Sequence, residues 1–331
     1  MTNRNYFGLD LLRGIAGYGV AITHYLYFVL NKSNFEYYSF IFVEIFFVLS
    51  GFVLSNQLIK IHKEKKNIKV FYIRRLFRTI PLYLVALIFY TAISNNFNLD
   101  FFKFLFFVQK IIPNFVDENY FMVAWSLSIE EFFYLIFPIY LVIFTNVKAS
   151  RLSMYFIILL SIIKIINHDN FSNDFLRTGT FIRLDSIALG FLLGIYFNKL
   201  INFKKSIIFS VLFLMIIFIN YKFLFFNNTG LNTVYFIFLS QALSILLVLF
   251  FCSFEFLFHN NLLRKISTLV ATQTYSVYLF HLIIMHFLLM SNDSIINNLF
   301  IYIIILFCIS TIIYKFFEKP ILLLRPNYKN E

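Results

Sequence analysis

The chain has 331 residues, of which 60% are hydrophobic and 13% charged, and it carries a formal net charge of +12. A water-soluble domain cannot bury this much apolar surface, whereas a lipid bilayer accommodates it. The composition therefore excludes an ordinary soluble protein and predicts an all-α polytopic integral membrane protein. Because no polar stretch is long enough to fold alone, we expect residues 1–331 to form a single transmembrane domain.

Apolar segments of about 20 residues, the length of one membrane crossing, recur along the whole chain. We expect about ten transmembrane helices around a central cavity. The first segment is too long for the apolar part of a typical cleavable secretion signal and carries Arg13 and His24, so we expect it to be retained. The ten predicted segments lie near residues 8–30, 39–59, 76–94, 121–145, 152–167, 181–198, 206–225, 231–253, 268–290 and 295–317.

The basic residues are distributed unevenly between the two sides of these segments. With the N-terminus inside, twenty of the 28 lysines and arginines fall on the inner side and six on the outer side, Lys164 among the latter. The positive-inside rule therefore places both termini in the cytoplasm. A charge of +12 also suits nucleic acid or anionic lipid as a partner, but topology accounts for most of it, so we expect no nucleic-acid partner.

The first apolar segment contains two ionisable residues eleven positions apart, Arg13 and His24. Eleven steps return a helix to nearly the same face, about 16 Å further along its axis. Ionisable groups are costly inside a bilayer and usually line a cavity enclosed by protein. The spacing therefore predicts an active site along one face of this helix.

The loop at residues 60–75 is the main polar interruption on the inner side. Its lysines are typical of a surface that attracts anionic lipid headgroups. Arg75 and Arg78, where the chain re-enters the membrane, are three positions apart and therefore neighbours on one helix face. Such a pair suits a phosphate group as a bidentate clamp, and it equally suits helix-end arginines that extend to lipid headgroups.

Residues 95–120 form the longest loop on the outer side. About twelve of them, from Phe101 to Ile112, form an apolar stretch that is too short to cross a bilayer. We expect an interfacial or re-entrant segment that walls one side of an external cavity. Elsewhere, Gly190 and Gly194 have the four-residue spacing of closely packed membrane helices.

Several other polar residues interrupt the apolar segments, and they suit structural hydrogen bonding or acceptor binding better than catalysis. Arg183 and Asp185 open the sixth segment and are expected to form an internal ion pair. The six histidines and two cysteines show no metal-ligand spacing, so we expect no metal. The possible structural or acceptor-binding residues are Asp10, Glu44, Trp125, Arg183, Asp185 and His281.

A series of motifs in a fixed order carries a resemblance to a known family. The chain resembles the membrane-bound acyltransferase 3 family, bacterial enzymes that O-acylate cell-surface glycans and related acceptors, over nearly its whole length. The motifs are Leu9-Asp10-x-x-Arg13-Gly14, Arg13-x10-His24, Phe46-Phe47-Val48-Leu49-Ser50-Gly51-Phe52, Phe71-Tyr72-Ile73-Arg74-Arg75-x-x-Arg78, Trp125-Ser126-Leu127-x-x-Glu130-x-x-x-Tyr134, Arg183-Leu184-Asp185, Tyr278-Leu279-x-His281 and Glu318-Lys319-Pro320.

The resemblance implies transfer of an acyl group, commonly acetyl, from cytoplasmic acyl-CoA to a hydroxyl at or beyond the outer face of a bacterial inner membrane. Arg75 and Arg78 then become the expected ligands of the CoA phosphates. A donor held there would extend its pantetheine arm along the first helix towards His24. Arg13 is too far from His24 to touch it, so donor binding or cavity electrostatics is its expected role.

His24 is the expected general base, because the unperturbed pKa of imidazole lies near the operating pH. It would accept the proton of the acceptor hydroxyl as that oxygen attacks the thioester. We expect Glu130 to orient His24 or the acceptor. The sequence leaves open whether transfer is direct or proceeds through an acyl-histidine.

Many members of the family carry an additional extracellular domain, whereas this sequence ends at Glu331, so we expect no appended domain. The expected acceptor is a cell-surface or lipid-linked saccharide that reaches a cavity near the outer surface. The alternative function is a polytopic transporter of a polar, saccharide-like substrate without covalent chemistry. A homologue that has lost catalysis and acts as a scaffold is a third alternative. The oligomeric state is not readable from the sequence.

Overall fold

The computed structural model describes residues 6–30, 34–65, 67–95, 97–117, 120–201, 203–226, 229–289 and 295–328. Within these ranges the regular structure is helical, with no β-strand. Eight helices in the described ranges are long and apolar enough to cross a membrane. The protein is therefore an all-α multi-pass membrane protein, as predicted.

Each of the ten predicted apolar segments falls on a long helix, and the two that lie outside the group of eight are α1 and α9. Shorter helices and turns connect them: α4 (Leu99–Leu105), η1 (Met122–Ala124), α7 (Asn173–Thr178), η2 (Phe181–Arg183), η3 (Glu255–His259), η4 (Tyr314–Glu318) and α13 (Lys319–Leu323). The long helices are α1 (Phe7–Leu30), α2 (Asn34–Glu64), α3 (Ile68–Ser94), α5 (Trp125–Ile143), α6 (Ala149–Ile166), α8 (Leu184–Leu200), α9 (Phe203–Phe226), α10 (Gly230–Ser253), α11 (Asn261–Leu289) and α12 (Ile295–Ile313).

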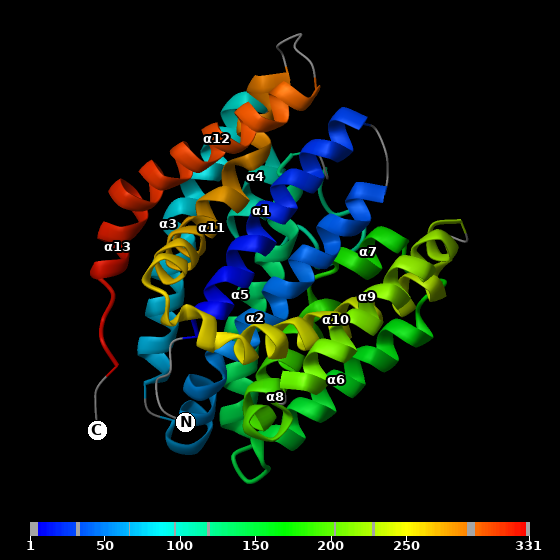
Figure 1. Ribbon diagram of the computed structural model, residues 1–331. Coiled ribbons are helices and arrows are strands. Elements are labelled where there is room, and N and C mark those ends of the chain that lie inside the picture. The colour runs from blue at the N-terminus through cyan, green and yellow to red at the C-terminus, as the bar shows by residue number, and fades with distance from the viewer. Residues whose placement is uncertain are drawn as a thin grey trace.

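Helix α1 lies in the middle of the bundle, between α2 and α11 (Figure 1). Small residues permit this position, because a Cβ at Gly14 or Gly17 would collide with Val270 or Thr274 of α11. The start of α1 is fixed from the α10–α11 connection, where the carboxylate of Glu255 accepts hydrogen bonds from the first backbone N–H groups of α1. These N–H groups have no partner within the helix, so the carboxylate satisfies them and complements the helix dipole.

Helices α2 and α8 pack closely, and α6, α9 and α10 lie on the same side of the bundle (Figure 1). A Cβ at Gly190 would overlap the backbone carbonyl of Val48, and one at Gly51 would overlap that of Ile187. The close helix packing predicted at Gly190 is therefore confirmed, and Gly51 supplies the opposite half of the contact.

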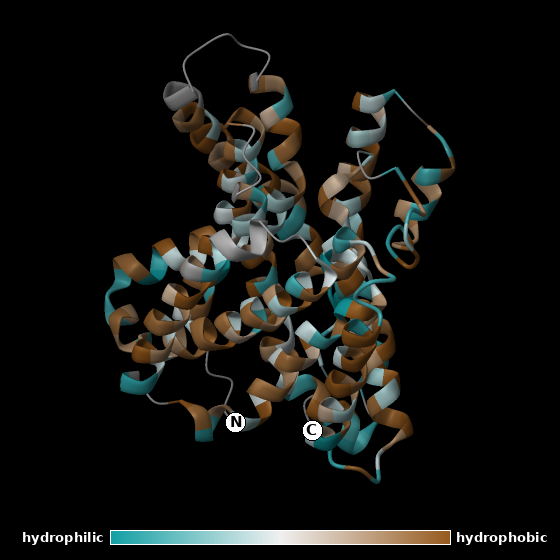
Figure 2. Cartoon of the chain, turned by 90° about the vertical axis from the view of Figure 1, so that its right-hand side faces the viewer, coloured by the Kyte–Doolittle hydropathy of each residue, from teal (hydrophilic) through white to brown (hydrophobic). Residues whose placement is uncertain are grey.

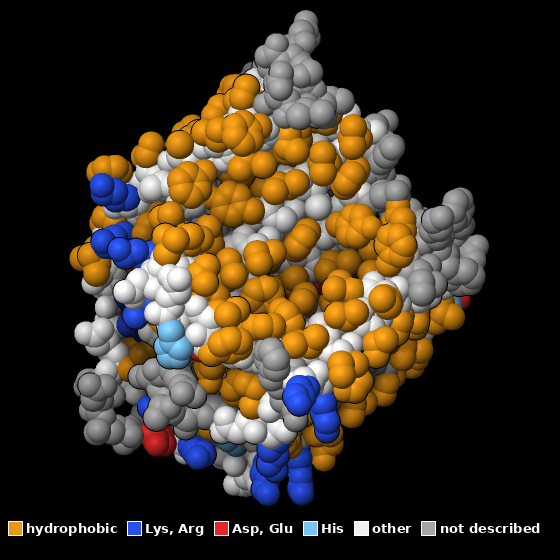
Figure 3. Space-filling model, viewed as in Figure 1, with side chains coloured by type: hydrophobic (Ala, Val, Ile, Leu, Met, Phe, Trp, Pro, Cys, Tyr) orange, Lys and Arg blue, Asp and Glu red, His pale blue; other side chains and the backbone are white. Residues whose placement is uncertain are grey.

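Hydrophobic residues run along most of the helices, whereas many hydrophilic residues gather at helix ends and connections (Figure 2). On the face in Figure 3, lysines and arginines lie over the α13 region and along the lower rim, and the middle of the face is hydrophobic. We call the end of the bundle with the α2–α3 connection and α13 the basic end. Arg74 of α3 hydrogen-bonds to Pro326, which confirms that these two parts are adjacent.

The stretch from residue 97 to residue 117 contains the short helix α4. The backbone carbonyl of Phe104, whose ring is buried, accepts a hydrogen bond from the Tyr83 hydroxyl. The side chains of Leu99 and Phe106 stay exposed, by 76% and 69%. This amphipathic arrangement agrees with a segment at the membrane interface. None of these residues lines the cavity described next.

Candidate active site

A cavity of about 1290 Å³, its open mouth included, lies between α1, α2, α3, α5 and α11. Five of the predicted site residues line it, and they come from three helices. Along α11 the lining extends from Thr268 to Tyr278, which corresponds to about 15 Å of helix. The predicted residues in the lining are Asp10, Arg13, Arg75, Arg78 and Glu130.

The guanidinium of Arg75 lies close to two aromatic rings, Phe71 and Tyr134, which meet edge to face. Its guanidinium carbon lies 5.7 Å from the ring centre of Tyr134 and 5.9 Å from that of Phe71. Within the described chain its side chain donates no hydrogen bond, and its buried Nε has no partner. Because a guanidinium offers five donors in a planar fork, this one is oriented and available to a ligand.

Glu130 holds the ring of Tyr134 in place beside Arg75. Its Oε2 accepts a hydrogen bond from Tyr134 at 3.1 Å, and its Oε1 accepts one from Ser50 at 3.0 Å. Glu130 therefore orients the ring on which Arg75 rests. In the described structure it makes no hydrogen bond to His24, which is one of the two partners expected from the sequence, the other being the acceptor.

Arg13 faces the same cavity and forms an ion pair with Asp10, with 3.5 Å between Nη1 and Oδ1. The two residues are three apart on α1 and share one face. Both side chains are partly exposed to the cavity. The pair places a partly compensated cation beside the path from Arg75 into the bundle.

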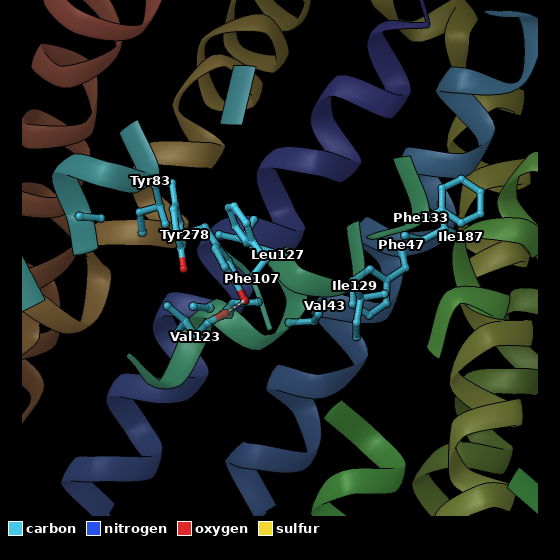
Figure 4. Packing of buried hydrophobic residues seen from close by; sticks show 14 of the residues in the cluster. Val43, Phe47, Tyr83, Phe107, Val123, Leu127, Ile129, Phe133, Ile187 and Tyr278 are labelled. Carbon is cyan, nitrogen blue, oxygen red and sulfur yellow. Dashed lines mark hydrogen bonds between the residues drawn. The ribbon is translucent and has the colours of Figure 1, made fainter. Parts of the chain in front are cut away.

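The cavity ends at Tyr278 and Ser126. The hydroxyl of Tyr278 lies 2.6 Å from that of Ser126. It donates a hydrogen bond to the backbone carbonyl of Val123 at 2.7 Å (Figure 4). The ring of Phe46 lies edge-on to that of Tyr278, with 6.3 Å between centroids. Tyr278 is thus fixed as the inner wall of the cavity.

His24 and His281 form a pair one helical turn beyond Tyr278. Nδ1 of His24 lies 2.9 Å from Nε2 of His281, and the two rings are stacked. His24 is partly buried and His281 fully buried, and neither residue lines the described cavity. The structure therefore places the two histidines beyond the inner wall.

The hydrogen bonds of His281 determine which nitrogen of His24 carries a proton. Nδ1 of His281 faces the carbonyl oxygens of Tyr278 and Val277, at 2.8 and 3.2 Å. Carbonyl oxygens only accept, so this nitrogen carries the hydrogen, and Nε2 of neutral His281 is an acceptor. His24 then donates through Nδ1, and its Nε2 keeps a free lone pair.

Four of the remaining predicted residues lie away from the cavity, and the ion pair expected between two of them is wrong. Arg183 pairs with Glu44 and not with Asp185. Asp185 pairs with Lys164, which is fully buried and does not lie in an outer loop. Residues two apart on a helix do not face each other, so each charge finds its partner on another helix.

The resulting cluster is structural in character. Gln241 donates a hydrogen bond to Asp185 and lies within hydrogen-bond distance of Ser186. Arg183 also donates to Ser186. Polar side chains from several helices therefore hydrogen-bond to one another in this buried cluster. Trp125 likewise packs against the rings of Phe40 and Phe47, outside the cavity lining.

Three cavity residues received no site role from the sequence, although Tyr134 and Glu318 belong to its motifs. Tyr134 follows Glu130 by four residues, a spacing that places both on one helix face and that points to their contact. Tyr314 and Glu318 reach the cavity because the chain forms a π-helical turn between them. Such single π turns are frequent at functional sites, but no local sequence signal marks this one.

The described residues contain no group of three or more His, Cys, Asp or Glu side chains arranged to hold a metal ion. Residues 6–315 match the family described as an acyltransferase domain. The chain belongs to this family. It is thus a multi-pass membrane protein of an acyltransferase family, and most of the cavity lies inside the matched region.

The relatives it matches are longer proteins. A candidate O-acetyltransferase of Staphylococcus aureus strain COL is 33% identical over 211 residues, which is 56% of this chain and 34% of the relative. The peptidoglycan O-acetyltransferase OatA of Listeria monocytogenes is 33% identical over 170 residues, 45% of this chain and 26% of the relative. The match to each spans about a third or less of the relative's length. No solved structure matches the chain.

Proposed function

We propose that this protein transfers an acyl group, normally acetyl, from acyl-CoA on the cytoplasmic side of a bacterial inner membrane to a saccharide hydroxyl at the outer face. The family and the names of its relatives support O-acetyl transfer to a glycan. The observation that carries the proposal is the cavity, which extends from the basic end to Tyr278, one turn short of His281, the partner of His24. At the basic end it is lined by Arg75 and Arg78, which form no ion pair with any described residue.

Acyl-CoA binds with its nucleotide at the basic end. Arg75 and Arg78 line the cavity there, and in the described structure neither donates a hydrogen bond through its side chain. A planar guanidinium binds phosphate oxygens through two parallel hydrogen bonds. The pantetheine arm then follows the cavity past the Arg13–Asp10 pair, which contributes to the electrostatics of its path.

The thioester reaches the inner end of the cavity near Tyr278. His24 accepts the hydroxyl proton of the acceptor on Nε2 as the acceptor oxygen forms a bond to the thioester carbonyl carbon. The C–S bond then breaks, and the CoA thiolate receives the proton that His24 took. His281 keeps Nε2 of His24 free by accepting from its Nδ1.

The acceptor approaches His24 from the side opposite the donor. His24 keeps part of its surface exposed although it lies beyond the donor cavity, which supports access from that side. Its class is a hydroxyl of a cell-surface or lipid-linked saccharide. The test for the acceptor therefore begins with peptidoglycan fragments, because OatA of Listeria monocytogenes is named for that substrate.

The proposal is tested with the protein in sealed proteoliposomes, by following radiolabelled acetyl from acetyl-CoA to a saccharide acceptor and, separately, the movement of saccharide across the membrane. The variants are His24→Ala and, as a matched control, His286→Ala, which removes an exposed histidine of α11. Transfer by wild type and the control, with loss in His24→Ala, supports the enzyme. Transport of unmodified saccharide without transfer of acetyl would instead identify a transporter.

A further inference from the structure

Three arginines at the basic end have side-chain donors without a partner among the described residues. Arg75 and Arg78 donate none of theirs within the described chain, and Arg325 uses only Nε, which donates to the carbonyl of Leu322 at 2.9 Å. No carboxylate lies within 4 Å of any of the three in the described ranges. Unpaired cations held together repel each other, and a bound polyanion relieves that repulsion.

Arg325 belongs to a short segment after α13, Arg325–Tyr328, which we call the strap. Burial lowers the pKa of Arg325, and the positive charges of Arg74, Arg78 and Arg75 lower it further, so all three charges act on Arg325. Leu322, which accepts from Arg325, lines the cavity itself. Arg325 therefore stands beside the cavity mouth.

The strap is fixed by specific contacts to two other helices. Nη1 of Arg74 on α3 donates to the carbonyl of Pro326 at 2.7 Å, and its guanidinium carbon lies 4.9 Å from the ring centre of Tyr328. The hydroxyl of Tyr328 donates to Gln57 of α2 at 2.9 Å. Arg74 is thus occupied in holding the strap, which leaves Arg75, Arg78 and Arg325 for a ligand.

We propose that Arg325 completes, with Arg75 and Arg78, a site for a nucleotide that carries several phosphate groups, and that the strap forms one wall of it. The proposal deepens the proposed function and rests on it for the identity of the nucleotide, the 3′-phosphorylated ADP part of coenzyme A. The family match ends at residue 315, so the strap lies outside it.

The test measures binding of 3′-phospho-ADP by titration calorimetry to the protein in phosphatidylcholine nanodiscs. We expect Arg325→Ala to weaken binding about tenfold or more, as expected for loss of charge-assisted hydrogen bonds. We expect Tyr328→Phe, which removes the hydrogen bond from the strap to Gln57, to weaken nucleotide binding by a few-fold. The control Arg151→Ala removes an exposed arginine of α6 and leaves binding unchanged. Equal unfolding temperatures establish that the variants are folded.

Unchanged binding by Arg325→Ala, beside weakened binding by Arg75→Ala, would overturn the strap as part of the site. Nanodiscs with phosphatidylglycerol distinguish the source of phosphate, because loss of nucleotide affinity there would assign the arginines to lipid headgroups. Acetyl transfer by wild type is measured in parallel. Arg325-dependent nucleotide binding without transfer leaves the site standing and overturns the proposed function alone.

Discussion

Nδ1 of His24 lies 2.9 Å from Nε2 of His281, although 257 positions separate the two residues in the chain. Because Nδ1 of His281 is committed to backbone carbonyls, the proton between the rings belongs to His24. The contact therefore directs the free lone pair of His24 to its Nε2. In the proposed mechanism, a histidine fixed in this way can act as a base without first changing its tautomer.

His24→Ala is expected to lower the acetyl-transfer rate by about 10²–10⁴-fold, the usual contribution of a positioned general base. The dissociation constant for acetyl-CoA stays near the wild-type value, because His24 lies beyond the donor cavity. Single-turnover transfer and calorimetric donor binding measure the two effects separately. A His24→Ala protein that transfers acetyl at the wild-type rate would contradict the assignment of the base.

His281→Gln is expected to retain more activity than His281→Leu. The glutamine carbonyl can still accept a hydrogen bond from Nδ1 of His24, whereas leucine cannot, so only leucine frees the ring to adopt the other tautomer. The loss appears in kcat, while KM for acetyl-CoA is unchanged. Equal losses in the two variants, or a rise in KM alone, would show that His281 serves packing and not the orientation of His24.

Arg75→Lys is expected to weaken CoA binding almost as much as Arg75→Ala does. The Arg75 guanidinium lies beside the rings of Phe71 and Tyr134, and a lysine ammonium group is a point charge that does not offer two parallel donors to a phosphate. Both variants raise the dissociation constant for CoA about tenfold or more. Arg151→Ala is the charge-matched control. If the lysine variant bound CoA as tightly as wild type, only the positive charge of Arg75, and not its planar shape, would matter for binding.

Glu44→Ala is expected to destabilise the protein by about 3 kcal/mol, because it leaves Arg183 buried and without its ion-pair partner. Thermal unfolding in detergent measures the effect. The double change of Glu44 to Gln and Arg183 to Met restores much of the stability, since no uncompensated charge remains. A single variant as stable as wild type would show that solvent reaches the cluster.

The sequence predicts well where the helices lie and that Arg75 and Arg78 face one cavity. It predicts poorly which buried charges form ion pairs with each other. Hydropathy places every long helix, and the three-residue spacing of Arg75 and Arg78 puts both at one cavity. Lys164 stands near the outer end of an apolar segment, so the sequence counts it among the basic residues of the outer side. Its burial depends on Asp185 of another helix, and no local pattern reports that pairing.

The same limit applies inside the site. Glu130 and Tyr134 could be paired from their spacing alone, whereas Glu318 enters the cavity through a π turn that the sequence does not mark. The pairing of His24 with His281 depends on α1 and α11 packing in parallel, in one register set by Gly14 and Gly17. Such registers are properties of the packed bundle.

The most direct test of the account is an experimental structure of the protein with a non-reactive acetyl-CoA analogue. The account predicts the nucleotide phosphates at Arg75 and Arg78, the arm in the cavity beside Arg13, and the acyl carbonyl at the Tyr278 end, next to His24. An analogue bound elsewhere, or bound in the cavity with its acyl group directed away from Tyr278, would contradict it.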